Sequence, residues 1–397
     1  MTLGVGQTSP RLAGDDSRER FDVVVIGAGQ AGLAAGYSLA QQRRHFVIVE
    51  ASNAVGAAWR TRWDSLVLFT PRRYSALAGL EFAGDPDGYP TRDEVVDYLE
   101  RYADTFELPI RLNSRVRSLA HSRNGFVVSL EDGELEAGQV VVATGPFQAP
   151  NVPDLANQLS PELFQAHSTA YMRATEVPDG RALVVGGGNT GYQIAKELAA
   201  THTVHLAIGS RQTPLPQRPL GRDLFWWLTK TGLINKTVDT RIGRRAQQRD
   251  TLIGSSPREL RRRHGIELKP RVVGADGRTV RFADGSEVDV DAVIWATGFR
   301  SDYSWIEPSV VGTDGRVRHR RGVTEVPGLY FLGLSWQHTR GSALIGWVKD
   351  DAEYIAERIA AHGHQPTAEP AAGHGARFTE AATGTPDDTP QSSGETR

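Results

Sequence analysis

Two glycine-rich stretches carry the residues whose types and spacing point most directly to chemistry. Each follows an apolar run and reads G-x-G-x-x-G. The glycines are Gly27, Gly29 and Gly32 in the first stretch and Gly186, Gly188 and Gly191 in the second. In such a turn the first glycine permits the bend, the second lets backbone approach a pyrophosphate, and the third allows close helix–strand packing. Because a helix N-terminus attracts phosphate, the sequence predicts two nucleotide sites.

The two predicted sites differ in the residue that would bind the ribose. Glu50 ends the next apolar run, FVIVE, eighteen residues after Gly32, where a carboxylate accepts ribose hydroxyls. The second stretch has Gly209 at the matching distance, followed by Ser210 and Arg211. A hydroxyl and a guanidinium suit a ribose 2′-phosphate, since both form charge-assisted hydrogen bonds with it. We therefore expect FAD in the first site and NADPH in the second.

Other arginines leave the second assignment open at this point. Arg211 also fits a solvated loop residue, and Arg218 and Arg222 are alternative partners for the 2′-phosphate.

Parallel sheets with covering helices must position these residues. Apolar runs alternate with helical patterns along the chain: FDVVVIG then AGLAAGYSLAQQ, FVIVE, QVVVATG, ALVVGGG then TGYQIAKELAA, VHLAIGS and DAVIWATG. The alternation predicts an α/β fold of two nested dinucleotide-binding, Rossmann-like domains, with the NADPH domain inserted into the FAD domain. Antiparallel hairpins are expected in 125–138 around Asp132-Gly133 and in 278–290 around Asp284-Gly285.

Composition shifts give the expected domain boundaries. They are a disordered N-terminus at 1–20, the first part of the FAD-binding domain at 21–150, the NADPH-binding domain at 151–295, the second part of the FAD-binding domain at 296–362, and a disordered tail at 363–397. Residues 220–265 interrupt the second domain as a helical insertion. This insertion either buries Phe225, Trp226 and Trp227 in a core or forms part of a substrate lid.

Composition also excludes several classes of function. The chain has 397 residues, and 45 Lys and Arg against 47 Asp and Glu give a net charge of −2. No broad basic field invites nucleic acid or an anionic membrane, and no apolar run is long enough to span a bilayer or act as a signal peptide, which predicts a cytoplasmic protein. With no cysteine, the chain cannot form disulfides or cysteine metal sites, so redox chemistry requires a cofactor, and no metal is expected.

Several segments together resemble the flavin-containing monooxygenases, from Phe21 to about Ala361. They are GAGQAG at 27–32, GAAWR at 56–60, ATGPFQAPNVP from Ala143, GGGNTG at 186–191, DAVIWATGFRSDYSWI from Asp291, and GLYFLGLSWQHTRGSALIGWVKDDAEYIAERI from Gly328. The chain looks most like shorter bacterial members described as flavoproteins associated with potassium transport. The resemblance implies that the Ala-Thr-Gly segments at 143–145 and 296–298 cross between the two domains.

The family's identifying motif, F-x-G-x-x-x-H-x-x-x-(F/Y), is kept only in part at 161–171. His167 and Tyr171 match, whereas Pro161 and Leu163 replace phenylalanine and glycine. Tyr171 favours oxygenation of a heteroatom, because the related Baeyer–Villiger enzymes carry tryptophan there. The active-site asparagine usual in animal-like members has no counterpart at 68–71. On the residues alone, His167 is interpreted as a structural, hydrogen-bonded histidine and not as a catalytic base.

The resemblance implies an enzyme in which NADPH reduces FAD, and the reduced flavin binds O2 at C4a and passes one oxygen atom to a sulfide, an amine or a ketone. The partners are then a small-molecule substrate and O2, with no nucleic acid, and a homodimer is compatible with the family. The expected FAD contacts are Gly27, Gly29, Gly32, Glu50, Trp59 and Arg60. The expected NADPH contacts are Gly186, Gly188, Asn189, Gly191, Ser210 and Arg211, and the pocket candidates are Trp336, Gln337, His338 and Thr339.

Two alternatives use the same nucleotide sites. One is an NAD(P)H-flavin oxidoreductase that passes electrons to a quinone or another acceptor without oxygenation. The other is a redox sensor that binds both nucleotides with negligible turnover. A disulfide reductase is excluded because the chain has no cysteine.

Overall fold

The strand–helix alternation of the sequence folds into two main sheets, one mixed and one parallel. The structure is a computed structural model that describes residues 19–210, 213–247, 251–307 and 309–362. The chain divides into two units, Met1–Gly363 and His364–Arg397. Residues 1–18 and the predicted tail 363–397, which includes the second unit, lie outside the described residues.

The first sheet has nine strands, and its parallel part follows the order β21-β6-β1-β2-β3. These strands are β1 (Glu19–Ile26), β2 (Phe46–Val49), β3 (Ile110–Arg111), β6 (Glu134–Val142) and β21 (Leu329–Phe331). β1 begins at Glu19, so the predicted disordered N-terminus 1–20 extended two residues too far. Strand β2 is buried throughout, as expected for a strand covered on both faces.

Antiparallel strands extend this sheet. β4 (Val116–Ser122) and β5 (Gly125–Leu130) form a ribbon with the first half of β6, which confirms the hairpin at Asp132-Gly133, and β19 (His319–Arg320) and β20 (Val323–Thr324) continue beyond β21. The ribbon and the parallel sheet share β6, so one strand serves both layers.

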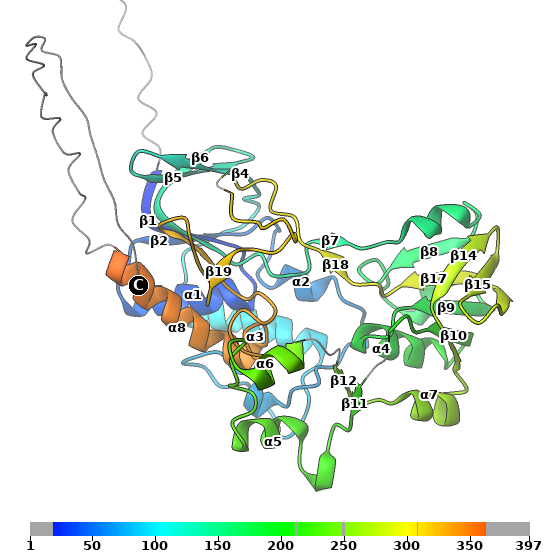
Figure 1. Cartoon of the computed structure of the whole chain (residues 1–397). Coiled ribbons are helices and arrows are strands. Elements are labelled where there is room, and N and C mark those ends of the chain that lie inside the picture. Colours follow the sequence, from blue (N-terminus) through cyan, green and yellow to red (C-terminus); the bar gives the residue numbers. More distant parts are fainter. Residues whose placement is uncertain (1–18, 211–212, 248–250, 308, 363–397) are drawn as a thin grey trace, which may run out of the picture. The chain divides into compact units, whose positions relative to one another are not determined.

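Three helices cover one face of the first sheet. They are α1 (Gln30–Gln41), α3 (Arg92–Thr105) and α8 (Ile345–His362), and α1 and α8 lie side by side (Figure 1). α3 begins with a capping box, in which Thr91 accepts from the Glu94 N–H and the Glu94 carboxylate accepts from the Thr91 N–H. Short helices α2 (Ala57–Arg60), η1 (Arg72–Tyr74), η2 (Asp154–Gln158) and η3 (Ala174–Glu176) lie in the connections.

The second sheet is parallel and follows the order β13-β10-β9-β17-β8. Its strands are β8 (Phe164–His167), β9 (Arg181–Val185), β10 (Thr203–Ala207), β13 (Glu267–Lys269) and β17 (Ala292–Trp295). Helices α4 (Asn189–Leu198) and α7 (Pro257–His264) contribute to the core on one face. On the other face lies an antiparallel ribbon of β14 (Val272–Asp276), β15 (Thr279–Phe282) and β16 (Glu287–Asp289), which confirms the hairpin at Asp284-Gly285.

The order of the strands along the chain confirms the nested design. All strands of the second sheet fall between β6 and β21 of the first. The chain crosses at β7 (Ala149–Pro150) and returns at β18 (Phe299–Arg300), and these two strands pair antiparallel, side by side (Figure 1). The exact domain boundaries stay predictions.

The insertion 220–265 is only partly helical. It contains the end of η4 (Pro219–Gly221), α5 (Leu224–Lys230), α6 (Arg241–Gln247), β12 (Thr251–Ile253) and α7, and β12 pairs in parallel with β11 (Thr213–Leu215). Phe225 is buried, as expected. Trp226 and Trp227 are only half-buried and meet edge to face at 4.7 Å, because α5 is short and presents their side to solvent.

Candidate nucleotide and substrate site

The first glycine turn has the geometry that the sequence motif predicts. Gly27 has φ +108°, and a Cβ there would lie 2.8 Å from the Ala143 carbonyl O. A Cβ on Gly32 would lie 1.8 Å from the Gly27 carbonyl O, so helix and strand pack too closely for any side chain. A Cβ on Gly29, in contrast, would meet nothing within 4 Å. The space beside Gly29 is open, as approach of a pyrophosphate requires.

The second turn repeats this arrangement glycine by glycine. A Cβ on Gly186 would lie 2.1 Å from the Ala296 carbonyl O, and one on Gly191 would lie 2.0 Å from the Gly186 carbonyl O. Gly188 again has nothing within 4 Å. The two turns are therefore equivalent in shape.

Both turns end in helices that lack a side-chain cap. Gly29 is the N-cap of α1 and Gly188 the N-cap of α4, and neither can accept a hydrogen bond through a side chain. The first N–H groups of each helix are thus directed to the open space beside the glycine. A phosphate there would satisfy these N–H groups and interact favourably with the helix dipole.

Glu50 lies beside the first turn. Its carboxylate accepts the Ala28 N–H at 2.8 Å and the Ser52 N–H at 3.0 Å. A carboxylate oxygen has two lone pairs, so both oxygens keep capacity for a ribose hydroxyl while the backbone fixes their orientation. Structure and sequence agree in placing Glu50 next to the glycine turn.

Trp59 and Arg60 have different surroundings, although they are adjacent on α2. The Trp59 Nε1–H donates to Gln30 Oε1 at 3.1 Å, so its indole lies at the N-terminus of α1. Arg60 instead pairs with Glu100 on α3. The structure brings Trp59, but not the guanidinium of Arg60, to the glycine turn.

The residues that were predicted to bind NADPH also differ in their surroundings. The Asn189 side chain binds β12, since its Oδ1 accepts the Ile253 N–H at 2.9 Å and its Nδ2 donates to the Thr251 O at 3.4 Å. Ser210 follows β10 and Ile208, at the carboxyl edge of the second sheet. Arg211 lies outside the described residues.

A different arginine approaches the ribose position of the second site. Arg271 Nη2 donates to the Gly209 carbonyl O at 3.1 Å, because Arg271 follows β13, the neighbour of β10. Sequence reasoning missed Arg271 because it lies 62 residues from Gly209 along the chain. Arg271 could have been identified only by recognising that the strands before Gly209 and before Arg271 pair side by side.

His167 lies against the second crossing of the chain, at Gly298 and Phe299. Its Nδ1 lies 3.0 Å from Thr169 Oγ1, its Nε2 lies 3.0 Å from the Gly298 carbonyl O, and Phe299 meets the ring edge to face at 5.1 Å. Burial lowers the pKa of His167, although the bond to Gly298 opposes the shift. With both nitrogens engaged, His167 has the surroundings of the structural residue that the sequence suggested.

Arg62 lies beside the same junction and was not anticipated. Its guanidinium packs 5.1 Å from the ring of Phe147 and 5.2 Å from that of Phe299, one ring from each crossing segment. No carboxylate pairs with it among the described residues, and burial lowers the pKa of Arg62.

The pocket candidates after β21 form a tight loop. Trp336 has φ +58°, a strained backbone for a bulky residue. The Gln337 side chain is buried beneath the loop, where Oε1 accepts the Leu334 N–H at 3.2 Å, so it does not have the predicted pocket-lining position. The Ser342 hydroxyl accepts the N–H groups of His338 and Thr339, both at 3.0 Å, and thereby fixes the turn.

Arg340 in this loop is a second cation without a carboxylate. Its guanidinium lies 6.0 Å from the Trp336 ring, and no ion pair or side-chain hydrogen bond joins it to another described residue. Burial alone lowers the pKa of Arg340. Arg340 is half-buried, and because a partly desolvated charge without a partner is costly, it is suited to an anion supplied from outside.

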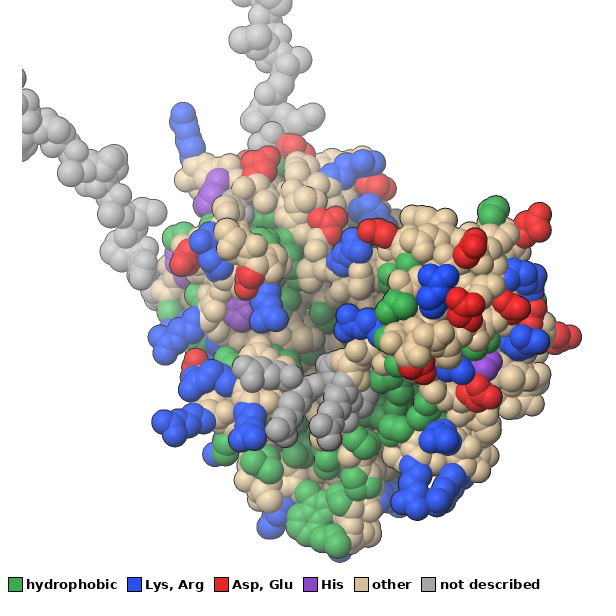
Figure 2. All heavy atoms as spheres, turned by 45° about the vertical axis from the view of Figure 1, so that its right-hand side comes forward, with side chains coloured by type: hydrophobic (Ala, Val, Ile, Leu, Met, Phe, Trp, Pro, Cys, Tyr) green, Lys and Arg blue, Asp and Glu red, His purple; other side chains and the backbone are tan. Residues whose placement is uncertain are grey.

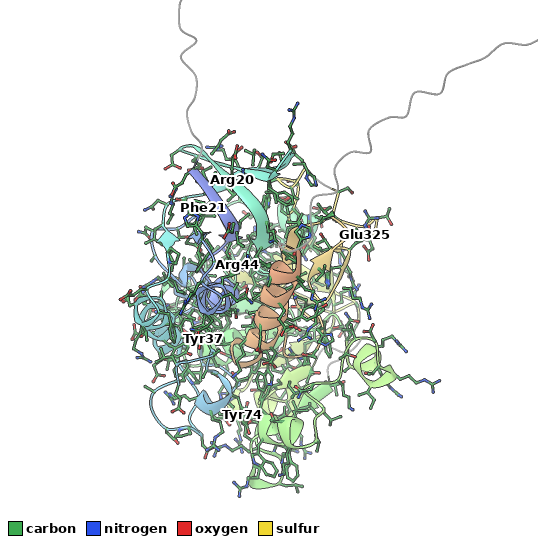
Figure 3. All side chains as sticks on the ribbon, turned by 90° about the vertical axis from the view of Figure 1, so that its left-hand side faces the viewer. Arg20, Phe21, Tyr37, Arg44, Tyr74 and Glu325 are labelled. Carbon is green, nitrogen blue, oxygen red and sulfur yellow. The ribbon has the colours of Figure 1, made fainter. Side chains whose placement is uncertain are left out.

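The insertion covers the loop after β21. The Val238 N–H donates to the His338 carbonyl O at 2.9 Å, and Thr237 and Thr339 form an isolated antiparallel bridge. Tyr74, labelled in Figure 3, stacks on Trp347 of α8 at 5.9 Å, and Phe225 of the insertion lies 5.7 Å from the same indole. The insertion thus packs on the first domain around the loop after β21.

Asp223 anchors the insertion to the first domain. Its carboxylate accepts the Phe225 N–H at 2.7 Å, the Tyr89 hydroxyl at 2.8 Å and the Gln217 amide at 3.0 Å. Gln217 also donates to the Phe69 carbonyl O at 2.8 Å.

Two surface hollows of about 440 and 650 Å³ are not the site. Their linings include Phe21 and Arg111 in one and Arg181 and Glu267 in the other, which lie at the amino ends of the parallel strands. Ligands of open α/β sheets bind at the carboxyl ends, where both glycine turns lie.

The class that the fold and these turns define is an oxidoreductase with two dinucleotide sites. Three comparisons agree with it. The family described as pyridine nucleotide-disulphide oxidoreductase matches residues 24–220. An uncharacterized CzcO-like oxidoreductase of Geobacillus kaustophilus is 48% identical over 343 residues, covering 86% of this chain and 99% of the relative. A flavin-containing monooxygenase from Stenotrophomonas maltophilia superposes with a TM-score of 0.74 at 28% identity, covering 87% of this chain and 99% of that one.

The chain belongs to the flavin monooxygenase family, among its CzcO-like oxidoreductases, and is an enzyme. The family uses flavin with a pyridine nucleotide. Despite the name of the matching family, dithiol chemistry is excluded because the chain has no cysteine. Among the described residues, no helix is long and apolar enough to cross a membrane. The association with potassium transport stays a prediction.

Proposed function

We propose that the chain is an NADPH-dependent FAD monooxygenase that inserts one oxygen atom from O2 into a small sulfide, amine or ketone. The observation that supports this proposal most directly is the pair of equivalent glycine turns, each open at its middle glycine. Glu50 lies at the proposed ribose position of the first turn and Arg271 at that of the second. Bound FAD would take electrons from NADPH and activate O2, which supplies the oxidising chemistry that the side chains lack.

In this proposal the first turn holds FAD. Gly27 and Gly32 shape the turn, Gly29 leaves room for the pyrophosphate, and the N-terminus of α1 binds it. Glu50 accepts the ribose hydroxyls, and Trp59 lies at the same helix terminus. Arg60 would contact FAD only after its ion pair with Glu100 breaks.

The second turn holds NADPH. Gly186 and Gly191 shape it, Gly188 leaves the space open, and Ser210 and Arg271 lie where a 2′-phosphate would be bound. A guanidinium beside this position favours NADPH over NADH, because NADH has a neutral hydroxyl there. Arg211 is a further partner on the sequence alone.

The loop after β21 and the insertion would enclose the substrate. Covering the loop with Thr237 and Val238 excludes water, which favours transfer of oxygen to substrate over wasteful peroxide release. An indole-3-pyruvate monooxygenase of Oryza sativa is 29% identical over 361 residues, covering 82% of this chain and 86% of the relative, and its named substrate is a 2-oxo acid. A ketone that carries a carboxylate would suit Arg340.

Isotope labelling tests the proposal. The purified protein is supplied with FAD, NADPH and a panel of sulfides, amines and ketones under ¹⁸O₂. One ¹⁸O atom in the product for each NADPH consumed supports a monooxygenase. NADPH consumption that ends in hydrogen peroxide or a reduced quinone, with unlabelled substrate throughout, would instead establish the flavin reductase.

A further inference from the structure

Positive charge is concentrated in the insertion 220–265. The segment has eleven Lys and Arg against four Asp and Glu, a net charge of +7, whereas the whole chain carries −2. The remainder of the chain therefore carries −9. The overall balance, which argued against contact with anionic surfaces, conceals a strongly basic segment.

The same segment exposes large apolar side chains. Leu220 is 90% exposed, Ile242 54% and Leu233 43%, which makes three of the eight large exposed apolar residues in the described part of the chain. The half-buried Trp226 and Trp227 lie between them in sequence. Figure 2 shows apolar side chains gathered over α5, with Lys and Arg at both sides.

Leu220 is held outward by a built turn. Its backbone has φ 53° and ψ 34°, a left-handed conformation that leucine rarely adopts. Trp227 Nε1 donates to the Pro219 carbonyl O at 3.0 Å, which ties the turn to α5, and the Arg222 guanidinium lies 5.6 Å from the Trp226 ring. A strained, exposed leucine contributes little to folding, so the turn points to a role outside the chain.

We propose that the insertion docks on an anionic lipid bilayer. Leu220 and the tryptophans would enter the boundary between headgroups and acyl chains, where indoles are favoured. Exposed cations of α6, Arg241 and Arg245, would pair with lipid phosphates. The loop after β21 lies against the same insertion, so docking would open a route for apolar substrates from the membrane to the proposed substrate site.

A second copy of the chain fits the surface less well. A protruding leucine needs a matching apolar hole in a protein partner, whereas the mixture of exposed apolar and cationic side chains on the insertion matches the mixed chemistry of an anionic lipid surface. Nucleic acid would satisfy the arginines but not Leu220 and Ile242. An anionic lipid surface accommodates both the arginines and the exposed apolar side chains.

Vesicle flotation of the full-length protein tests this directly. We expect binding to vesicles of phosphatidylcholine mixed with phosphatidylglycerol, loss of binding in high salt, and little binding to phosphatidylcholine alone. Reversing two charges with Arg241→Glu and Arg245→Glu should weaken binding at least about 30-fold, since the loss of each cation near the surface alone costs about 1 kcal/mol. Arg123→Glu with Arg316→Glu, a pair of equal charge elsewhere on the surface, should change it much less.

Leu220→Asn tests the apolar contact without altering charge. Asparagine tolerates left-handed backbone, so the unfolding temperature should not fall, while vesicle binding should drop about fivefold or more. Val273→Asn, at a valine that is 55% exposed outside the insertion, is the matched control.

Three results would overturn the proposal. They are absence of vesicle binding by the unmodified protein, equal binding to neutral and anionic vesicles, and equal losses in the control and test variants. A dimer that dissociates in Leu220→Asn, together with absence of vesicle binding, would assign the surface to a second copy. None of these results depends on the monooxygenase reaction.

Discussion

Replacing Arg271 with alanine is the sharpest test of the second nucleotide site. Arg271 follows a strand that neighbours the one before Gly209, and its Nη2 lies 3.1 Å from the Gly209 carbonyl O. Ser210 is the next residue along the chain. A 2′-phosphate bound there would gain a charge-assisted hydrogen bond that the 2′-hydroxyl of NADH cannot match.

The expected magnitude follows from the exposure of the site. A hydrogen bond to a charged group contributes about 1.5–3 kcal/mol. Arg271 is exposed, and solvent screening reduces the value to about 1–2 kcal/mol. Arg271→Ala should therefore raise KM for NADPH roughly 5- to 30-fold and KM for NADH less than about twofold.

Steady-state consumption of NADPH and NADH at several salt concentrations provides the assay. The difference between wild type and variant should shrink as salt screens the guanidinium. Arg316→Ala, at an exposed arginine of the first domain, should leave both KM values unchanged. Equal increases for the two nucleotides, or none, would refute the role of Arg271.

Four further substitutions have distinct expected outcomes. A valine at Gly29 fits the backbone and the empty space, so Gly29→Val should keep the fold but block FAD binding. Gly188→Val should instead keep FAD, measured by flavin absorbance, and raise KM for NADPH at least about tenfold. Because burial lowers the pKa of His167, the unfolded chain binds more protons just below about pH 6.5. Stability should therefore fall as pH drops through that value, and His167→Gln should flatten the dependence of unfolding temperature on pH. Arg340→Met should raise KM for carboxylate-bearing substrates more than for neutral ones, and an equal effect on both would exclude anion binding.

Local sequence determined much of what could be predicted. Each glycine turn is a contiguous six-residue motif, and Glu50 comes at the end of the next strand, so their association depends only on the βαβ unit. The hairpins at Asp132-Gly133 and Asp284-Gly285 were predictable for the same reason, since the turn residues lie between the paired strands. Such features need no knowledge of distant contacts.

The rest depends on contacts between distant segments. Arg271 reaches Gly209 only because β13 is the neighbour of β10, and Arg62 lies beside Phe147 and Phe299 only because the chain crosses twice between domains. Arg60 was expected at FAD but pairs with Glu100, a residue on another helix. No local pattern encodes such pairings.

Arg62 and Arg340 differ in how far the protein compensates their charge. Arg62 packs against two aromatic rings, and cation–π attraction offsets part of its desolvation. Arg340 has one ring at 6.0 Å, in a loop that contains a strained tryptophan. The uncompensated cost is therefore larger at Arg340, and strain of this kind persists where a ligand later repays it. Of the two cations, Arg340 is therefore the one that we propose binds an anion of the ligand, and it lies in the loop that the insertion covers.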